Sequence, residues 1–304
     1  MIYGLPLVGR HGLGHSLLAW GRCQIWCRDH GATPLAPRWL QPRIGPYLRR
    51  ERDKRNYFLL FRRGHAIGGV RKAMILATTP QVDEAAYRAE TARDPLVVLF
   101  RSIADNDVRE DFAPLKGQGR WLRRELEAMT RPGYRPKREI AKGAIAIHVR
   151  LGDFTVADAE QVARGRQNVR IGIDWYVEAL ARLRAGLGAA TPAILFSDGA
   201  DRELAPLLGV PGVSRAPRQS AVTDMLSIAG ADALIGSGSG FSIWGSLLGE
   251  VPRLSASGQQ LVRVLASPDA EAELAPGADI PLSFIAAVKA HRSRPANEAA
   301  PCAA

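Results

Sequence analysis

Three side chains that can bind or orient an anion fall within six positions of this chain: His148, Arg150 and Asp153. They follow an apolar run, 144–147, that predicts a buried strand. Open α/β sheets bind ligands beyond the carboxyl ends of their strands. An arginine there offers a fork of donors suited to a phosphate or diphosphate, and Gly152 allows a sharp turn. The alternative is a strand that ends in a solvated Arg–Asp pair, and spacing alone leaves both open.

Glycine and serine alternate at 237–242, directly before a predicted helix. Small residues let backbone N–H groups reach a phosphate, and a helix N-terminus adds a favourable dipole. The alternative is a flexible Gly-Ser turn, although the strand-turn-helix context argues against a linker. The candidate side chains are Ser237, Ser239, Phe241 and Ser242, and Phe241 has a core position as its alternative.

The elements that must position these residues alternate along the second half of the chain. This alternation predicts a parallel sheet covered by helices on both faces. Asp174 is the expected N-cap of one of the helices. The expected strands are 143–148, 193–197 and 233–235, and the expected helices are 173–187, 201–208, 221–229 and 242–248.

The first half opens with the order strand, glycine-rich turn and helix. Strands are expected at 2–8 and 96–100 and helices at 16–30 and 116–129, while 57–61 fits a buried strand or a helical turn. Segment 131–136 has linker composition. We therefore expect domains at 1–135 and 136–292, followed by a disordered Ala- and Pro-rich tail at 293–304.

The net charge of +11 is partly concentrated at 43–72, which holds ten Lys or Arg residues against Glu51 and Asp53. Such a segment could face nucleic acid, an anionic membrane or a charged substrate, or could be a solvated surface. No helix-turn-helix, zinc-finger or RNP pattern is present, so no specific nucleic-acid partner is expected.

The cysteines and the hydropathy pattern indicate a cytoplasmic protein. Cys23, Cys27 and Cys302 give no disulfide framework, and free thiols fit a reducing compartment. No apolar run reaches the roughly 18 residues of a membrane-spanning helix, and no signal peptide is evident. Asp105 and Asp107 have the spacing of a metal-binding carboxylate pair, with a turn rich in capping residues as the alternative.

The motif His-x-Arg-x-Gly-Asp at 148–153 resembles the donor-site motif shared by the α1,2-, α1,6- and protein O-fucosyltransferases. Three further segments resemble the bacterial α1,2-fucosyltransferase family in the same order. Segment 12–18 is similar to its Gly-Leu-Gly-Asn-Gln-Leu-Phe opening, 194–198 to its Phe-Ser-Asp segment, and 235–245 to its Asn-Ser-Ser-Phe-Ser-Trp-Trp-Gly segment. The chain departs from the family pattern at His15, Ser16, Gly240 and Ile243.

The resemblance implies a GT-B-like α/β fold, in which two Rossmann-like domains with parallel sheets face a cleft. Segment 1–135 would be the acceptor-side domain and 136–292 the nucleotide-sugar-binding domain. The implied reaction transfers fucose from GDP-fucose to a glycan hydroxyl with inversion, without a cofactor or a metal. For a bacterial enzyme acting on lipid-linked or envelope glycans, segment 43–72 would contact the anionic inner face of the membrane.

The resemblance also implies roles for individual residues. Arg150 would contact the donor phosphates, and His148 would lie near the nucleotide, with a core histidine at a strand end as its alternative. Independently of the resemblance, Asp153 could orient Arg150 or act as a base on the acceptor, and we favour orientation because a carboxylate beside an arginine is a poor base. Asp198 could bind the guanine amine or ribose hydroxyls, with a turn-forming role as its alternative. Asp224 would lie close to the donor or be an ordinary helix N-terminal charge. The rival functions are transfer from another nucleotide sugar, a basic binding protein, and an inactive relative.

Overall fold

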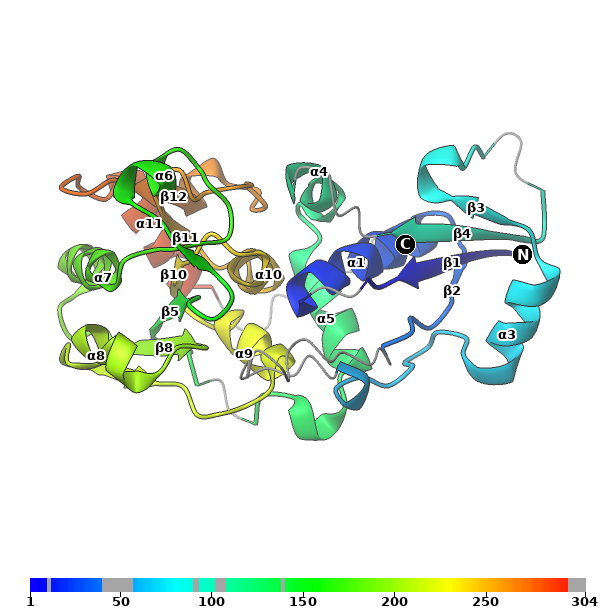
Figure 1. The fold of residues 1–304 in the computed structure, drawn as a ribbon, viewed down its shortest axis with the longest axis horizontal. Helices are drawn as coiled ribbons and strands as arrows, with labels where there is room; N and C mark the ends of the chain where they lie inside the picture. Colours follow the sequence, from blue (N-terminus) through cyan, green and yellow to red (C-terminus); the bar gives the residue numbers. More distant parts are fainter. Residues whose placement is uncertain (10–11, 40–56, 90–92, 102–107, 138–139, 295–304) are drawn as a thin grey trace.

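The computed structural model describes residues 1–9, 12–39, 57–89, 93–101, 108–137 and 140–294, and these residues form two larger parallel sheets and a third, two-stranded one (Figure 1). The first sheet has the strand order β2-β1-β4-β3. Its strands are β1 (Ile2–Leu7), β2 (Thr33–Pro34), β3 (Gln81–Asp83) and β4 (Leu96–Arg101).

One helix covers each face of this first sheet, because its strands are apolar on both sides. Helix α1 (Leu13–Asp29) lies on the face of Val98 and Phe100, and α3 (Gly69–Thr78) lies on the face of Leu5 and Leu99. Cys23 and Cys27 of α1 are free and buried, as predicted, whereas Cys302 lies outside the described residues.

The second sheet has the order β12-β11-β10-β5-β8-β9, with every neighbouring pair parallel. The chain runs from β5 outward through β8 and β9, then returns to the other side of β5 for β10, β11 and β12. The strand order therefore reverses between β5 and β10. The strands are β5 (Ile145–Val149), β8 (Ala193–Ser197), β9 (Val213–Arg215), β10 (Ala233–Gly236), β11 (Arg253–Ala256) and β12 (Glu271–Leu274).

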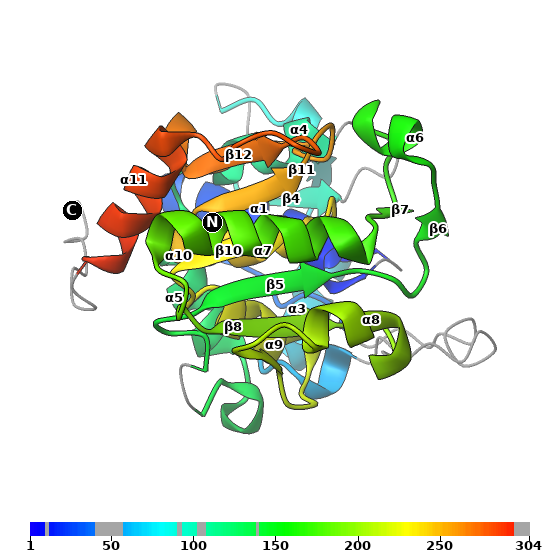
Figure 2. The same cartoon turned by 90° about the vertical axis from the view of Figure 1, so that its left-hand side faces the viewer.

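Helices cover both faces of the second sheet. Ile145 and Ile147 of β5 pack toward α7 (Ile173–Leu187), α8 (Asp201–Leu208) and α11 (Leu282–Arg292), and Figure 2 shows α7 lying across β5. Ala146 packs on the opposite side, in a cluster with Ile228 of α9 (Ala221–Ile228), and α10 (Gly240–Gly249) packs against α9. An excursion after β5 contains β6 (Thr155–Val156), α6 (Ala159–Ala163) and β7 (Val169–Arg170).

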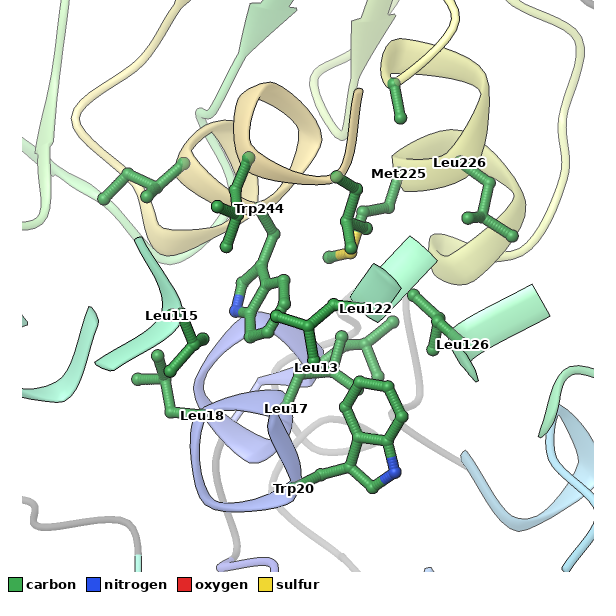
Figure 3. Close-up of a cluster of buried hydrophobic side chains, with 14 of the residues drawn as sticks. Leu13, Leu17, Leu18, Trp20, Leu115, Leu122, Leu126, Met225, Leu226 and Trp244 are labelled. Atoms are coloured by element: carbon green, nitrogen blue, oxygen red, sulfur yellow. The ribbon is translucent and has the colours of Figure 1, made fainter. Parts of the chain in front are cut away.

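A single hydrophobic core joins the two halves of the molecule. Figure 3 shows Leu13 and Leu17 of α1 together with Leu122 of α5 (Gly119–Met129), facing Met225 of α9 and Trp244 of α10. The indole Nε1 of Trp244 donates a hydrogen bond to the carbonyl oxygen of Gly14 at 2.7 Å. Helix α4 (Val108–Phe112) contributes Phe112 to the same core.

The predicted α/β class, with a parallel sheet in each half of the chain, is confirmed. The predicted bounds 173–187, 193–197 and 201–208 agree with α7, β8 and α8. The predicted domain boundary after residue 135 falls between the last strand of the first sheet and the first strand of the second, and the division into domains stays a prediction.

Several details of the expected elements were wrong. Gly172, and not Asp174, is the N-cap of α7. The helix expected from Lys116 starts at Gly119, because Lys116 is the non-helical C-cap of the preceding 3-10 turn at 113–115 and Gly117 has φ +74°. For segment 57–61 the helical-turn alternative is confirmed, since Tyr57–Leu59 forms a short 3-10 helix. The sequence analysis did not foresee α3, β11, β12 or α11. Residues 40–56 and the tail at 295–304 lie outside the described residues.

Candidate donor site

The carboxyl ends of three adjacent strands bring most of the predicted site residues together. Arg150 follows β5, Asp198 follows β8, and Ser237 follows β10, and β5 lies between the other two strands. This edge includes the point where the strand order reverses, which is where open α/β sheets bind ligands. Sequence alone placed these residues at strand ends, and the strand order makes them neighbours.

Arg150 is held by carboxylates from two directions. Its Nη1 lies 2.6 Å from Asp198 Oδ2, and its Nη2 donates to Asp153 Oδ1 at 2.6 Å. Asp198 also accepts the backbone N–H groups of Leu151 at 2.8 Å and Gly152 at 3.1 Å. The Asp198 carboxylate thereby joins the end of β8 to the turn after β5, so the turn and the guanidinium share one support.

Asp153 is the more exposed of the two partners of Arg150. Its side chain is 37% exposed, against 18% for Asp198. The guanidinium carbon of Arg150 also lies 5.7 Å from the ring centroid of Phe154, a cation–π contact. The expectation that Asp153 contacts Arg150 matches the geometry, while its catalytic role stays a prediction.

The serine-rich segment after β10 forms a compact hydrogen-bonded turn. Ser239 is the N-cap of α10, and its Oγ accepts the N–H of Ser242 at 3.3 Å. Ser242 Oγ accepts the N–H of Ser237 at 3.1 Å, and Ser237 Oγ lies 2.9 Å from Ser239 Oγ. The turn therefore presents the N-terminus of α10 beside the end of β5, and that end of the helix dipole favours an anion.

His148 is the inner neighbour of this turn. Its Nδ1 lies 2.7 Å from Ser242 Oγ and 3.1 Å from Ser237 Oγ, and its ring stacks on Phe241 with centroids 4.8 Å apart. Burial lowers the pKa of His148 to about 4, with Arg150 adding to this effect and Asp198 opposing it. The imidazole is therefore neutral at pH 7. Because Ser242 Oγ accepts both the N–H of Ser237 and the hydroxyl of Ser239, we assign its own hydroxyl as the donor to Nδ1 and the ring proton to Nε2.

The start of α1 belongs to the same region. A Cβ added at Gly14 would lie 3.2 Å from backbone atoms of Gly240 and Phe241, so the two helix starts touch here. The adjacent residues include half-buried His15, one of the positions that depart from the family pattern. Asp224 lies half-buried in the first turn of α9, which packs against α10. Its predicted proximity to the donor stays a prediction.

Gln259 is a functional candidate that the sequence analysis missed. It is 1% exposed, and its Nε2 donates to the carbonyl oxygens of Val162 at 2.8 Å and Arg166 at 3.3 Å. A Cβ at Gly238 would lie 2.3 Å from Gln259 Oε1. Gln259 thus links the excursion after β5 to the serine turn. An isolated glutamine carries no motif, so no sequence signal pointed to it.

The metal and membrane predictions fall largely on residues that the structure does not describe. Among the described residues, no group of three or more His, Cys, Asp or Glu side chains could hold a metal ion, and Asp105 and Asp107 lie outside them. No described helix is long and apolar enough to cross a membrane. Six of the ten basic residues of segment 43–72 also lie outside the described residues.

No protein-family model matches the chain, and a search of curated proteins found no match. Solved structures with a similar arrangement include the α-1,6-fucosyltransferase NodZ soaked with GDP-fucose, at 15% identity and TM-score 0.41, covering 82% of this chain and 92% of that one. They also include selenomethionine-labelled NodZ from Bradyrhizobium, at 14% identity and TM-score 0.42, covering 82% of this chain and 92% of that one. A third is the apo-form of POFUT1, at 12% identity and TM-score 0.44, covering 84% of this chain and 96% of that one.

Proposed function

We propose that this chain is a glycosyltransferase that binds a nucleotide diphosphate sugar between the ends of β5 and β10. One observation carries the proposal. At the point where the strand order of the second sheet reverses, Arg150 follows one of the two strands, and the serine-capped N-terminus of α10 follows the other. An arginine fork opposite a helix N-terminus is an arrangement suited to a diphosphate.

The charges around Arg150 suggest how a phosphate is accommodated. Two carboxylates outweigh one guanidinium, so a diphosphate must replace one of them. Asp198 is fixed by two backbone N–H groups, whereas the side chain of Asp153 is more exposed to solvent. In the proposed complex, phosphate oxygens take the place of Asp153 on Arg150, and Asp198 keeps the guanidinium in position. Neutral His148 supports the serine turn without adding charge.

The four segments that resemble the α1,2-fucosyltransferases support GDP-fucose as the donor. In the proposed reaction, an acceptor hydroxyl oxygen attacks the anomeric carbon in line and forms the new glycosidic bond. The bond from that carbon to the diphosphate oxygen breaks, and its electron pair leaves with GDP. The acceptor proton passes to a base that we do not assign. Arg150 and the α10 N-terminus stabilise the charge that grows on the leaving diphosphate, and we expect no metal requirement.

A thermal-shift panel tests the proposal. It compares GDP, GDP-fucose, GDP-mannose, UDP and UDP-sugars with and without Mg²⁺ or Mn²⁺, on wild type and Arg150→Ala. Arg164→Ala is the matched control, because Arg164 forms an exposed ion pair on α6. A ligand at 100 times its Kd stabilises the folded state by about 2.7 kcal/mol.

We expect stabilisation by GDP and GDP-fucose without metal in wild type and Arg164→Ala, and its loss in Arg150→Ala. A preference for UDP or a metal requirement would reject the proposed donor or mechanism. A folded wild type that responds to no nucleotide would reject the transferase function and favour a basic binding protein.

A further inference from the structure

The first sheet has a cavity of its own at its carboxyl edge. The cavity has a volume of about 430 Å³, within the range of small-molecule sites. Its wall is formed by the end of β1 and the two residues that follow, and three cationic side chains complete it. The lining residues are Leu5, Pro6, Leu7, Val8, Gly9, Arg38, Lys72 and Arg101.

The position of the cavity follows the same topological rule as the donor site. In the order β2-β1-β4-β3, β2 lies on one side of β1 and β4 on the other, so the strand order reverses between β1 and β4. Arg101 is the last residue of β4, and Leu7 is the last residue of β1 opposite it. A ligand is expected at this point of an open α/β sheet.

The polar part of the cavity lining is cationic. Of the described residues that line it, none is acidic. Lys72 Nζ donates to the carbonyl oxygen of Ala36 at 2.5 Å, and the pKa of Lys72 is lowered, first by burial and then by the charge of Arg38. Arg101 forms an ion pair with Asp83 at 2.8 Å, but both side chains are more than half exposed, and such pairs are weak in water. Several like charges around one cavity favour an anion.

The cavity lies on the side of the first half that leads to the donor site. Gly9, in its wall, lies five positions before Gly14, whose carbonyl oxygen accepts the Trp244 indole N–H. A chain of that length spans at most about 18 Å. Figure 1 shows β1 pointing toward the start of α1 and toward α10. A sugar-sized ligand in the cavity would therefore lie within an oligosaccharide's reach of the donor.

We infer that this cavity binds an anionic group, a carboxylate or a phosphate, on the acceptor glycan. That the ligand belongs to an acceptor rests on the proposed transferase function, whereas the anion site itself rests on the cavity and its three cations. The apolar wall formed by Leu5 and Val8 suits a sugar ring face. Acceptors of this class are uronic-acid-containing or phosphorylated glycans.

Calorimetric titration of the full chain without nucleotide tests the inference. The probes are glucuronic acid, glucose 6-phosphate, glucose and inorganic phosphate, at one fixed ionic strength because salt screens the interaction. The variants are Lys72→Gln and Arg101→Gln. Lys289→Gln is the control, because Lys289 is exposed on α11 and its substitution removes one positive charge away from the cavity. The side chain of Arg101 is exposed, so we expect Arg101→Gln to fold and to test the inference even if Lys72→Gln does not fold.

We expect one of the two anionic sugars to bind at least tenfold more tightly than glucose. The better probe identifies the group as carboxylate or phosphate. Each cavity variant should weaken that binding by about tenfold, the usual effect of losing one charged hydrogen bond, and Lys289→Gln should not. Equal binding of glucose, inorganic phosphate binding as tightly as glucose 6-phosphate, or an unchanged affinity in Arg101→Gln would overturn the inference.

The nucleotide panel separates this inference from the proposed function. Nucleotide stabilisation without binding of an anionic sugar would reject the anionic acceptor alone. Binding of an anionic sugar by a chain that responds to no nucleotide would reject the transferase function and retain the cavity as an anion site.

Discussion

The guanidinium of Arg150 lies 2.6 Å from the carboxylate of Asp198, so a side chain from the end of β5 is positioned by one from the end of β8. The same carboxylate accepts the N–H groups of the two residues that follow Arg150. A Cβ at Gly152 would lie 2.5 Å from Asp198 Oδ2, which explains the glycine at this position. The orientation of Arg150 thus depends on a contact between segments 46 to 48 residues apart.

This arrangement predicts opposite effects for the two carboxylates around Arg150. Asp198→Asn should weaken GDP binding by about tenfold or more and lower the free energy of unfolding by roughly 1–3 kcal/mol, because one oxygen can no longer accept the turn's N–H groups and the guanidinium. Asp153→Asn should leave GDP binding unchanged or stronger, since it removes a charge that competes with phosphate. Calorimetry and urea unfolding on both variants measure the effects, and equal losses of GDP affinity would contradict the proposed exchange.

Arg150 itself should be needed for turnover and not for folding. We expect Arg150→Ala to lower the rate of transfer by about 10²–10³-fold, the usual effect of losing one preorganised donor to the leaving group. Arg150→Lys should recover only part of the rate, because an ammonium cannot form the two-pronged contact. The measurement is GDP release with an acceptor, alongside circular dichroism, and near-wild-type turnover in Arg150→Ala would reject its phosphate role.

The buried imidazole of His148 should make the stability of the protein depend on pH. Its folded pKa, about 4, lies below the ordinary value of 6.5, so the unfolded state binds more protons between these values. The contribution to stability is therefore complete above pH 6.5 and is lost as the pH falls toward 4. A shift of this size corresponds to roughly 3 kcal/mol.

The variant His148→Gln isolates this contribution, because glutamine cannot titrate. Urea unfolding at several pH values between 7 and 4 should show a steeper fall in the free energy of unfolding for wild type than for the variant. Parallel pH profiles would mean that His148 is not neutral and buried as the geometry implies.

Two glycines of the serine turn should differ sharply in their tolerance of a methyl group. Gly238→Ala places a Cβ 2.3 Å from Gln259 Oε1, whose side chain is held by two carbonyl groups, so we expect a loss of about 1–3 kcal/mol and weaker GDP binding. Gly240→Ala is the matched control, since a Cβ there has no heavy atom within 4 Å. Adding Gln259→Ala to Gly238→Ala should recover GDP binding in calorimetry if the clash is the cause, and no recovery would exclude this cause.

The hydrogen bond from Trp244 should contribute to the contact between the two halves of the molecule. Trp244→Phe leaves the buried carbonyl of Gly14 without this donor and removes part of a fully buried ring. We expect the free energy of unfolding to fall by roughly 2–4 kcal/mol, from the lost hydrogen bond and the lost packing together. Urea unfolding measures this, and a change below about 0.5 kcal/mol would show that the halves are held by other contacts.

The sequence by itself determined the local elements and the chemical types at their ends. Apolar runs such as 193–197 and the helical pattern of 173–187 appear in the structure with those bounds, because burial on both faces of a parallel sheet demands continuous apolar residues. It also placed Arg150 and Ser237 just beyond strands. Where it failed, as at Asp174 and at the start of α5, local conformation and not hydropathy decided the helix boundary.

The tertiary structure alone decided which of those ends meet. The order that sets β5 between β8 and β10 brings Asp198 to Arg150, and the serine turn to His148, across 48 to 94 residues of chain. Tertiary structure also decided the hydrogen bonds of Gln259 to the excursion after β5, and the meeting of three cations around the cavity of the first sheet. Hydropathy and spacing report each residue's local surroundings, whereas strand order follows from the packing of the whole sheet, so no local pattern could have revealed these contacts.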